Sequence, residues 1–196
     1  MKHALTILAL LLATGCGAHV KPIDLHDPLV PLESRRLLAD AQDAIAIARV
    51  DDEKARQNLH MTRNWRDELL EDRRWGKVSD SALEKLEQFA DARVKLAELE
   101  LDKADARVDL AKSKYKLVTA ETAVRHDIAV YDLEPLRDDT DGIRKEIADI
   151  TGKIADQRVA LEKITRSWWA TYAKIMHSSA ATPAMYVNFS AHDEEE

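Results

Sequence analysis

Cys16 is the only cysteine in the 196-residue chain, so any chemistry that needs a thiol must use this residue. No second cysteine is present to form a disulfide with it inside the chain. It follows the letters LATG at positions 12–15, and an apolar run at 4–13 begins behind Lys2. A cationic start, an apolar stretch too short to span a bilayer and small residues before a cleavage point are typical of a secretory signal peptide. We therefore predict that residues 1–15 are removed and take no part in the fold.

This segment resembles bacterial lipoprotein signals, in which a small residue precedes a cysteine that receives lipid and becomes the first residue of the mature protein. The resemblance covers residues 1–16 and implies a covalent lipid on Cys16, such as palmitate, that anchors the protein in a membrane. Because Gly17 and not Asp follows the cysteine, the resemblance also implies transport to the outer membrane, facing the periplasm. The alternative is an ordinary secretory signal cleaved near Gly17 or Ala18, which leaves a soluble periplasmic protein.

Other residues that could do chemistry do not converge in the sequence. No Glu is followed three residues later by His, as the metal sites of di-iron helix bundles require. His126 and Asp127 are adjacent and would lie about 100° apart around a helix, so they cannot act on one another. Glycine-rich phosphate loops and a Gly-x-Ser-x-Gly elbow are also missing. We predict no catalytic residue, no metal, no cofactor besides the lipid, and no enzymatic activity.

The composition favours long helices. The chain has five Gly, five Pro and 33% charged residues of mixed sign, with a formal net charge of -7. Loss of Lys2 with the signal changes this charge to about -8, so we expect no binding to nucleic acid. Such a composition is typical of an all-α coiled coil with a narrow apolar seam and solvated flanks. Because Cys16 has no disulfide partner, stability must come from helix packing or from association.

Pro and Gly divide the chain. Pro22, Pro28 and Pro31 predict that 16–32, which begins with the lipidated cysteine, is an extended tether. Gly76 separates two long stretches without Gly or Pro, and Pro135 precedes a third apolar pattern. We predict an elongated helical domain over 33–177, with helices at about 33–75, 81–132 and 136–177. A disordered acidic tail is expected at 178–196.

Mostly apolar residues at steps of three and four define a seam on each predicted helix. The second seam has two consecutive steps of four, from 86 to 90 to 94, and Asp52, Thr62 and Arg66 interrupt the first. The seam positions are 38, 41, 45, 48, 52, 55, 59, 62, 66 and 69 in the first helix; 83, 86, 90, 94, 97, 101, 104, 108, 111, 115 and 118 in the second; and 136, 140, 143, 147, 150, 154, 157, 161, 164, 168, 171 and 175 in the third. Long antiparallel helices in an up-down-up three-helix bundle follow from this pattern. The alternative is a hairpin whose second arm runs from about Ser81 to His177 with a kink at Pro135. The residues at 138–142 favour a break near that proline. The seams can be satisfied within one chain or between chains of a homo-oligomer.

Aromatic residues mark the most informative surface. In an up-down-up arrangement, Trp65 and Trp75 near the end of the first helix lie in the same half as Trp168, Trp169 and Tyr172 near the end of the third. Trp168 is on the seam and is predicted to be buried, whereas Trp169 lies off the seam. Exposed tryptophan often anchors a protein partner. We therefore predict a partner contact at Trp169, Trp75 and Tyr172.

These patterns predict a lipid-anchored, non-enzymatic lipoprotein of the cell envelope that acts as a coiled-coil spacer, scaffold or adaptor at the outer membrane. The alternative is an accessory component of an outer-membrane efflux or secretion assembly. The segment 66–86, with WGKVS at 75–79 ahead of a long Ala- and Leu-rich helix, resembles the helical hairpins of the TolC outer-membrane channel family. That resemblance covers a few turns, and the strand repeats of such channels are missing.

Overall fold

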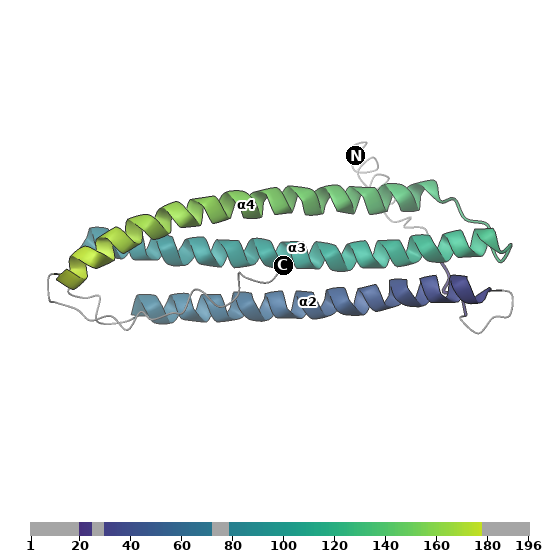
Figure 1. Ribbon diagram of the computed structural model, residues 1–196, viewed down its shortest axis with the longest axis horizontal. Helices are drawn as coiled ribbons and strands as arrows, with labels where there is room; N and C mark the ends of the chain where they lie inside the picture. The colour runs from purple at the N-terminus through teal and green to yellow at the C-terminus, as the bar shows by residue number, and fades with distance from the viewer. Residues whose placement is uncertain (1–19, 25–29, 72–78, 178–196) are drawn as a thin grey trace, which may run out of the picture. The chain divides into compact units, whose positions relative to one another are not determined.

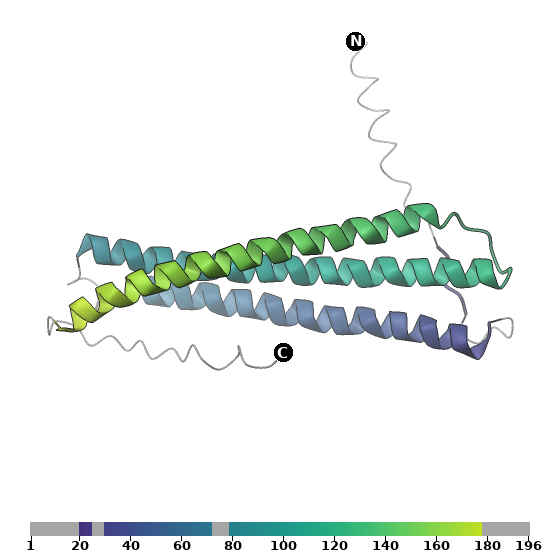
Figure 2. The ribbon, with the colours of Figure 1, turned by 45° about the horizontal axis from the view of Figure 1, so that its top comes forward.

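The computed structural model describes residues 20–24, 30–71 and 79–177, and these residues contain helices and no strand. The helices are α2 (Leu32–Glu71), α3 (Asp80–Arg125) and α4 (Glu134–His177), which Figures 1 and 2 show as three long elements. The predicted all-α class with three helices is confirmed. No helix among the described residues is both long and apolar enough to cross a membrane.

The chain divides into two compact units, and each contains part of all three helices. The first unit comprises the chain up to Arg56 and Glu100–Gly152, and the second comprises Gln57–Leu99 and the chain from Lys153 onward. In both units α2 and α3 are antiparallel, because their contacts join later residues of α2 to earlier residues of α3. These contacts are Ser34–His126 (2.9 Å) and Arg56–Asp105 (2.6 Å) in the first unit, and Arg63–Glu98 (2.8 Å) and Arg66–Asp91 (2.5 Å) in the second.

The contacts between α3 and α4 are also antiparallel. In the first unit, Arg137 binds Glu121 at 3.1 Å, and the hydroxyl groups of Thr140 and Ser113 lie 2.8 Å apart. In the second unit the Gln157 amide donates to the Ala92 carbonyl at 2.9 Å, and the Lys85 ammonium donates to the Thr171 hydroxyl at 3.1 Å. The helices therefore follow the predicted up-down-up order of a three-helix bundle.

The predicted seams agree with the burial of side chains. Every seam position with a described side chain is buried or half-buried in all three helices. The helix α3 also has a second buried stripe that the sequence did not predict. It includes Ala82, Phe89, Ala92, Leu99, Ala106, Ser113 and Ala120. This stripe carries the contacts of Ala92 and Ser113 with α4. Because it consists mainly of Ala, its hydrophobic pattern is weak.

The prediction that the second helix continues to residue 132 is wrong, because α3 ends at Arg125. Asp127 takes a positive φ of 55°, and the amide of Ile128 donates to the Ala123 carbonyl at 2.9 Å. These features form a Schellman motif, in which a left-handed residue closes the helix. Asp tolerates this conformation better than most residues do, so the helix ends without a glycine signal.

The third helix begins earlier than predicted. Glu134 starts α4 and its amide donates to the Asp132 carboxylate at 3.2 Å, while Pro135 lies in the first turn, where proline is tolerated. The break between helices therefore precedes Pro135, and the alternative of one kinked arm is not observed. The residues at 138–142, which were expected to favour a break, are helical. The hydroxyl of Thr140 among them donates to the Leu136 carbonyl at 2.9 Å.

Part of the predicted tether is held by the first unit. Val30 is fully buried, and the Arg35 guanidinium donates to its carbonyl at 2.7 Å. The backbone amide of Lys21 donates to the Tyr131 hydroxyl at 3.2 Å. The segment predicted as an extended tether therefore contacts the first unit at these residues, since an apolar side chain at 30 gains free energy from burial. Cys16 and the tail at 178–196 lie outside the described residues.

Candidate functional site

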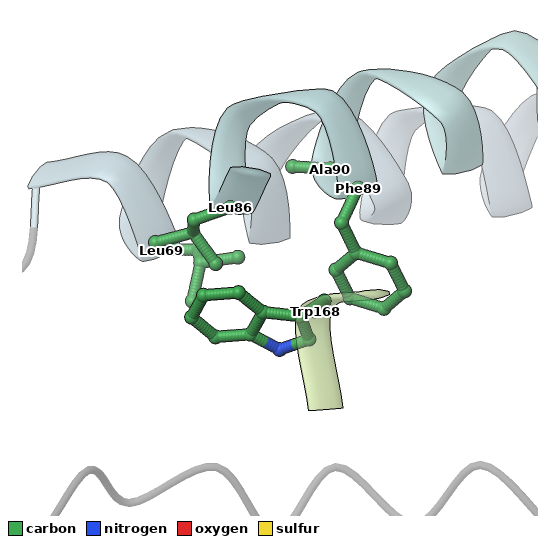
Figure 3. Close-up of a cluster of buried hydrophobic side chains, with 5 residues drawn as sticks. All are labelled: Leu69, Leu86, Phe89, Ala90 and Trp168. Atoms are coloured by element: carbon green, nitrogen blue, oxygen red, sulfur yellow. The ribbon is translucent and has the colours of Figure 1, made fainter. Parts of the chain in front are cut away.

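The aromatic part of the second unit is built around Trp168, which is 1% exposed. Its indole packs in a cluster with Leu69 of α2 and with Leu86, Phe89 and Ala90 of α3. Figure 3 shows the ring pointing toward Leu69 and Leu86 on one side and toward Phe89 on the other. Trp168 thus brings side chains of all three helices into one core, and its predicted burial is confirmed.

Trp169, the next residue, is rotated about 100° around the helix axis from Trp168 and is 44% exposed. Its ring meets that of Tyr172 edge to face, with centroids 5.3 Å apart. Tyr172 in turn packs against the buried cluster, with its ring centroid 6.0 Å from that of Trp168. A rigid exposed indole loses little side-chain entropy when a partner binds. The structure therefore brings two of the predicted contact residues together, and Trp75 lies outside the described residues.

Trp65 of α2 completes this aromatic region. It is half-buried against the cluster and meets Phe89 edge to face at 6.1 Å. The Arg93 guanidinium lies over the Trp65 ring, 5.0 Å from its centroid. Burial lowers the pKa of Arg93, although a guanidinium stays charged at every physiological pH. The predicted gathering of tryptophans is confirmed for Trp65, Trp168 and Trp169.

A cluster of charged residues in the first unit was only partly predicted. Arg56 donates to Asp52 one turn earlier at 3.1 Å and to Asp105 of α3 at 2.6 Å. The two carboxylates interact, and desolvation together with Asp52 raises the pKa of Asp105, against the opposing effect of Arg56. The i,i+4 spacing of Asp52 and Arg56 indicated the first contact. The contact with Asp105 depends on the antiparallel register, which no local pattern specifies.

The other residues considered for chemistry were His126, Asp127 and Cys16. His126 lies 2.9 Å from the Ser34 hydroxyl, while the neighbouring Asp127 terminates α3. No group of three or more potential metal ligands gathers anywhere in the described part of the chain. Cys16, the predicted site of lipid attachment, lies outside that part.

Trp169 and Tyr172 form an aromatic surface on α4, and Tyr172 packs against the buried Trp168. The surface offers apolar area and the faces and edges of two aromatic rings. Comparisons of the chain with protein-family models, with curated proteins and with solved structures found no match.

Proposed function

We propose that this protein is a lipid-anchored lipoprotein of the bacterial cell envelope that acts, without enzymatic activity, as a helical spacer, scaffold or adaptor at the outer membrane. The observation that carries the proposal is Cys16, preceded by small residues and an apolar run. Each buried CH₂ of an attached acyl chain contributes about 0.8 kcal/mol, so more than one chain anchors durably.

The helices support a role in spacing or recruitment. The helices α2, α3 and α4 contain 40, 46 and 44 residues. At a rise of 1.5 Å per residue each is roughly 60–70 Å long, which far exceeds the average helix of a globular protein. Helices of this length with narrow seams suit reach and recruitment better than the enclosure of a substrate. The contact for a partner protein is the exposed Trp169 together with the half-buried Tyr172 beside it.

The anchor is tested by replacing Cys16 with Ser in bacteria grown with labelled palmitate. We expect the parent protein to carry label and to sediment with membranes, whereas Cys16→Ser carries no label and leaves the membrane fraction. Thr14→Ser is the matched control, because it alters the same segment, keeps a small residue and leaves the cysteine. Continued labelling and sedimentation of the Cys16→Ser protein would refute the proposal.

The destination is tested at the next residue. By the resemblance to lipoprotein signals, Gly17→Asp should hold the labelled protein in the inner membrane, while Gly17→Ser should reach the outer membrane as the parent does. Separation of the two membranes by density provides the measurement. If Gly17→Asp and Gly17→Ser distribute alike, the outer-membrane assignment loses its support.

A further inference from the structure

The helix α4 carries a second stripe of residues on the side away from its seam. Within the second unit this stripe advances by alternating steps of four and three, which is the spacing of a coiled-coil seam. Its members are Ala155, Val159, Glu162, Arg166, Trp169 and Ala173. The stripe lies about 130° around the helix axis from the seam residues Ile154, Leu161, Ile164 and Trp168, which are buried or half-buried. We call it the outer stripe.

Every residue of the outer stripe is exposed. The two large apolar members, Val159 and Trp169, are 53% and 44% exposed, respectively. Glu162 and Arg166 form an ion pair one turn apart along the helix, with their side chains 62% and 77% exposed. A pair this accessible contributes little to the stability of a single chain. The stripe therefore offers apolar area and opposite charges that the fold itself does not consume.

The order of residues along the outer stripe is self-complementary. A twofold axis that crosses the helix between Glu162 and Arg166 places Glu162 of one copy opposite Arg166 of the other, and the reverse. The same axis pairs Val159 with Trp169 and Ala155 with Ala173. We propose that the outer stripe is a homodimer interface, on which the α4 helices of two copies of this chain pack antiparallel.

The charges and sizes of the side chains support this occupant. An isologous interface requires that if residue i contacts residue j, then j contacts i, and the outer stripe satisfies this rule at each level. In an antiparallel coiled coil, the two types of seam position face each other across the interface, as the 4-3 spacing here provides. Small Ala155 and Ala173 allow close approach at both ends, while Trp169 gives a large aromatic contact for Val159.

The geometry also predicts the strength of the dimer. From Ala155 to Ala173 the outer stripe is about 27 Å long, which is short for a coiled coil. Lys163 lies beside the axis, where it would face its own copy, and like charges oppose association. We therefore expect a dissociation constant on the order of 10–100 µM, as for a weak and reversible interface. Because Lys163 opposes pairing, Lys163→Ala should tighten the dimer.

Sedimentation equilibrium tests the proposal on the chain from Gly17 to Glu196, which contains every described residue. Over about 10 µM to about 1 mM, the mass should rise from monomer to dimer. Glu162→Arg and Arg166→Glu should each raise the dissociation constant about tenfold or more, because each places four like charges at the axis. An equimolar mixture of the two variants should form a heterodimer, since the opposite charges then meet again. The matched control is Lys54→Glu, an exposed partner of an ion pair on α2, which should dimerise as the parent does.

A parent chain that stays monomeric up to about 1 mM would overturn the proposal. Equal dimerisation of Glu162→Arg and the parent would also overturn it, as would failure of the mixed variants to associate when the parent dimerises. The inference rests on the proposed function only in taking Trp169 as a partner contact. Failure of the dimer proposal is distinguishable from failure of the lipid-anchor proposal, because palmitate labelling of Cys16 does not depend on the outer stripe.

Discussion

Adjacent tryptophans on α4 should differ sharply in their effect on stability. Trp168 is 1% exposed and packs against three helices, whereas Trp169 is 44% exposed and contacts Tyr172. A buried tryptophan removes up to about 250 Å² from water, which at about 25 cal/mol per Å² corresponds to roughly 6 kcal/mol. An alanine at this position would still bury part of that area, so we expect Trp168→Ala to lower the free energy of unfolding by about 3–5 kcal/mol.

The matched variant, Trp169→Ala, removes the same side chain from the next position. It loses one edge-to-face contact, so we expect a decrease of about 0.5–1.5 kcal/mol. Urea unfolding followed by circular dichroism at 222 nm gives both values at a chain concentration low enough to keep the protein monomeric. Trp168→Ala should lower the urea midpoint more than Trp169→Ala does.

Equal destabilisation by the two variants would refute the reasoning, and so would a larger effect of Trp169→Ala. Either result would mean that the cluster of Trp168 with Leu69, Leu86, Phe89 and Ala90 does not hold the second unit together. Trp168→Phe separates size from aromatic character. It should recover part of the loss, because a phenyl ring fills more of the space than a methyl group does.

Substitutions at three further residues test the structure by urea unfolding. Asp105→Asn should stabilise the protein at pH 7, because burial and Asp52 raise the pKa of Asp105 and make its ionised form unfavourable in the fold. This gain in stability should fade as the pH falls toward about 3.8, where Asp105 is protonated in both the folded and the unfolded state. A gain that stays constant with pH would contradict the prediction. Gly152→Ala should raise the free energy of unfolding by about 0.5–1 kcal/mol, because the added methyl group meets nothing within 4 Å on α4; a loss of stability would contradict the open space. Asp127→Gly should raise the free energy of unfolding by about 0.5–1 kcal/mol, since the φ of 55° suits glycine, whereas Asp127→Val should lower it. The reverse order of stability would contradict a positive φ at Asp127.

The helices and their seams could be predicted from the sequence because their signals are local. Long stretches without Gly or Pro, interrupted near Gly76 and Pro135, gave the number and order of helices. The 4-3 spacing gave the seam, and each described seam residue is buried or half-buried. The end of α3 was missed because Asp127 closes it where a glycine is usual.

The candidate site was predictable only where it depended on a helix period. The burial of Trp168 and the exposure of Trp169 follow from their positions relative to the seam. The contact between Arg56 and Asp105 joins residues 49 positions apart, so it depends on how α2 and α3 are aligned. The second buried stripe of α3 was hidden for another reason. Its alanines are favourable in any helix, so their number does not distinguish a core face from a solvated face.

Polar contacts fix the alignment of helices whose alanine-rich faces are nearly uniform. In the first unit the Ser113 hydroxyl is buried and lies 2.7 Å from the Asp139 carboxylate and 2.8 Å from the Thr140 hydroxyl. A shift of α4 by one heptad would still place its Leu and Ile side chains against the alanines of α3, but it would leave the buried Ser113 hydroxyl without these partners. Each unsatisfied group costs about 1–3 kcal/mol, whereas a shifted alanine contact costs little. The polar residues therefore select one register among several that the apolar seam alone would allow.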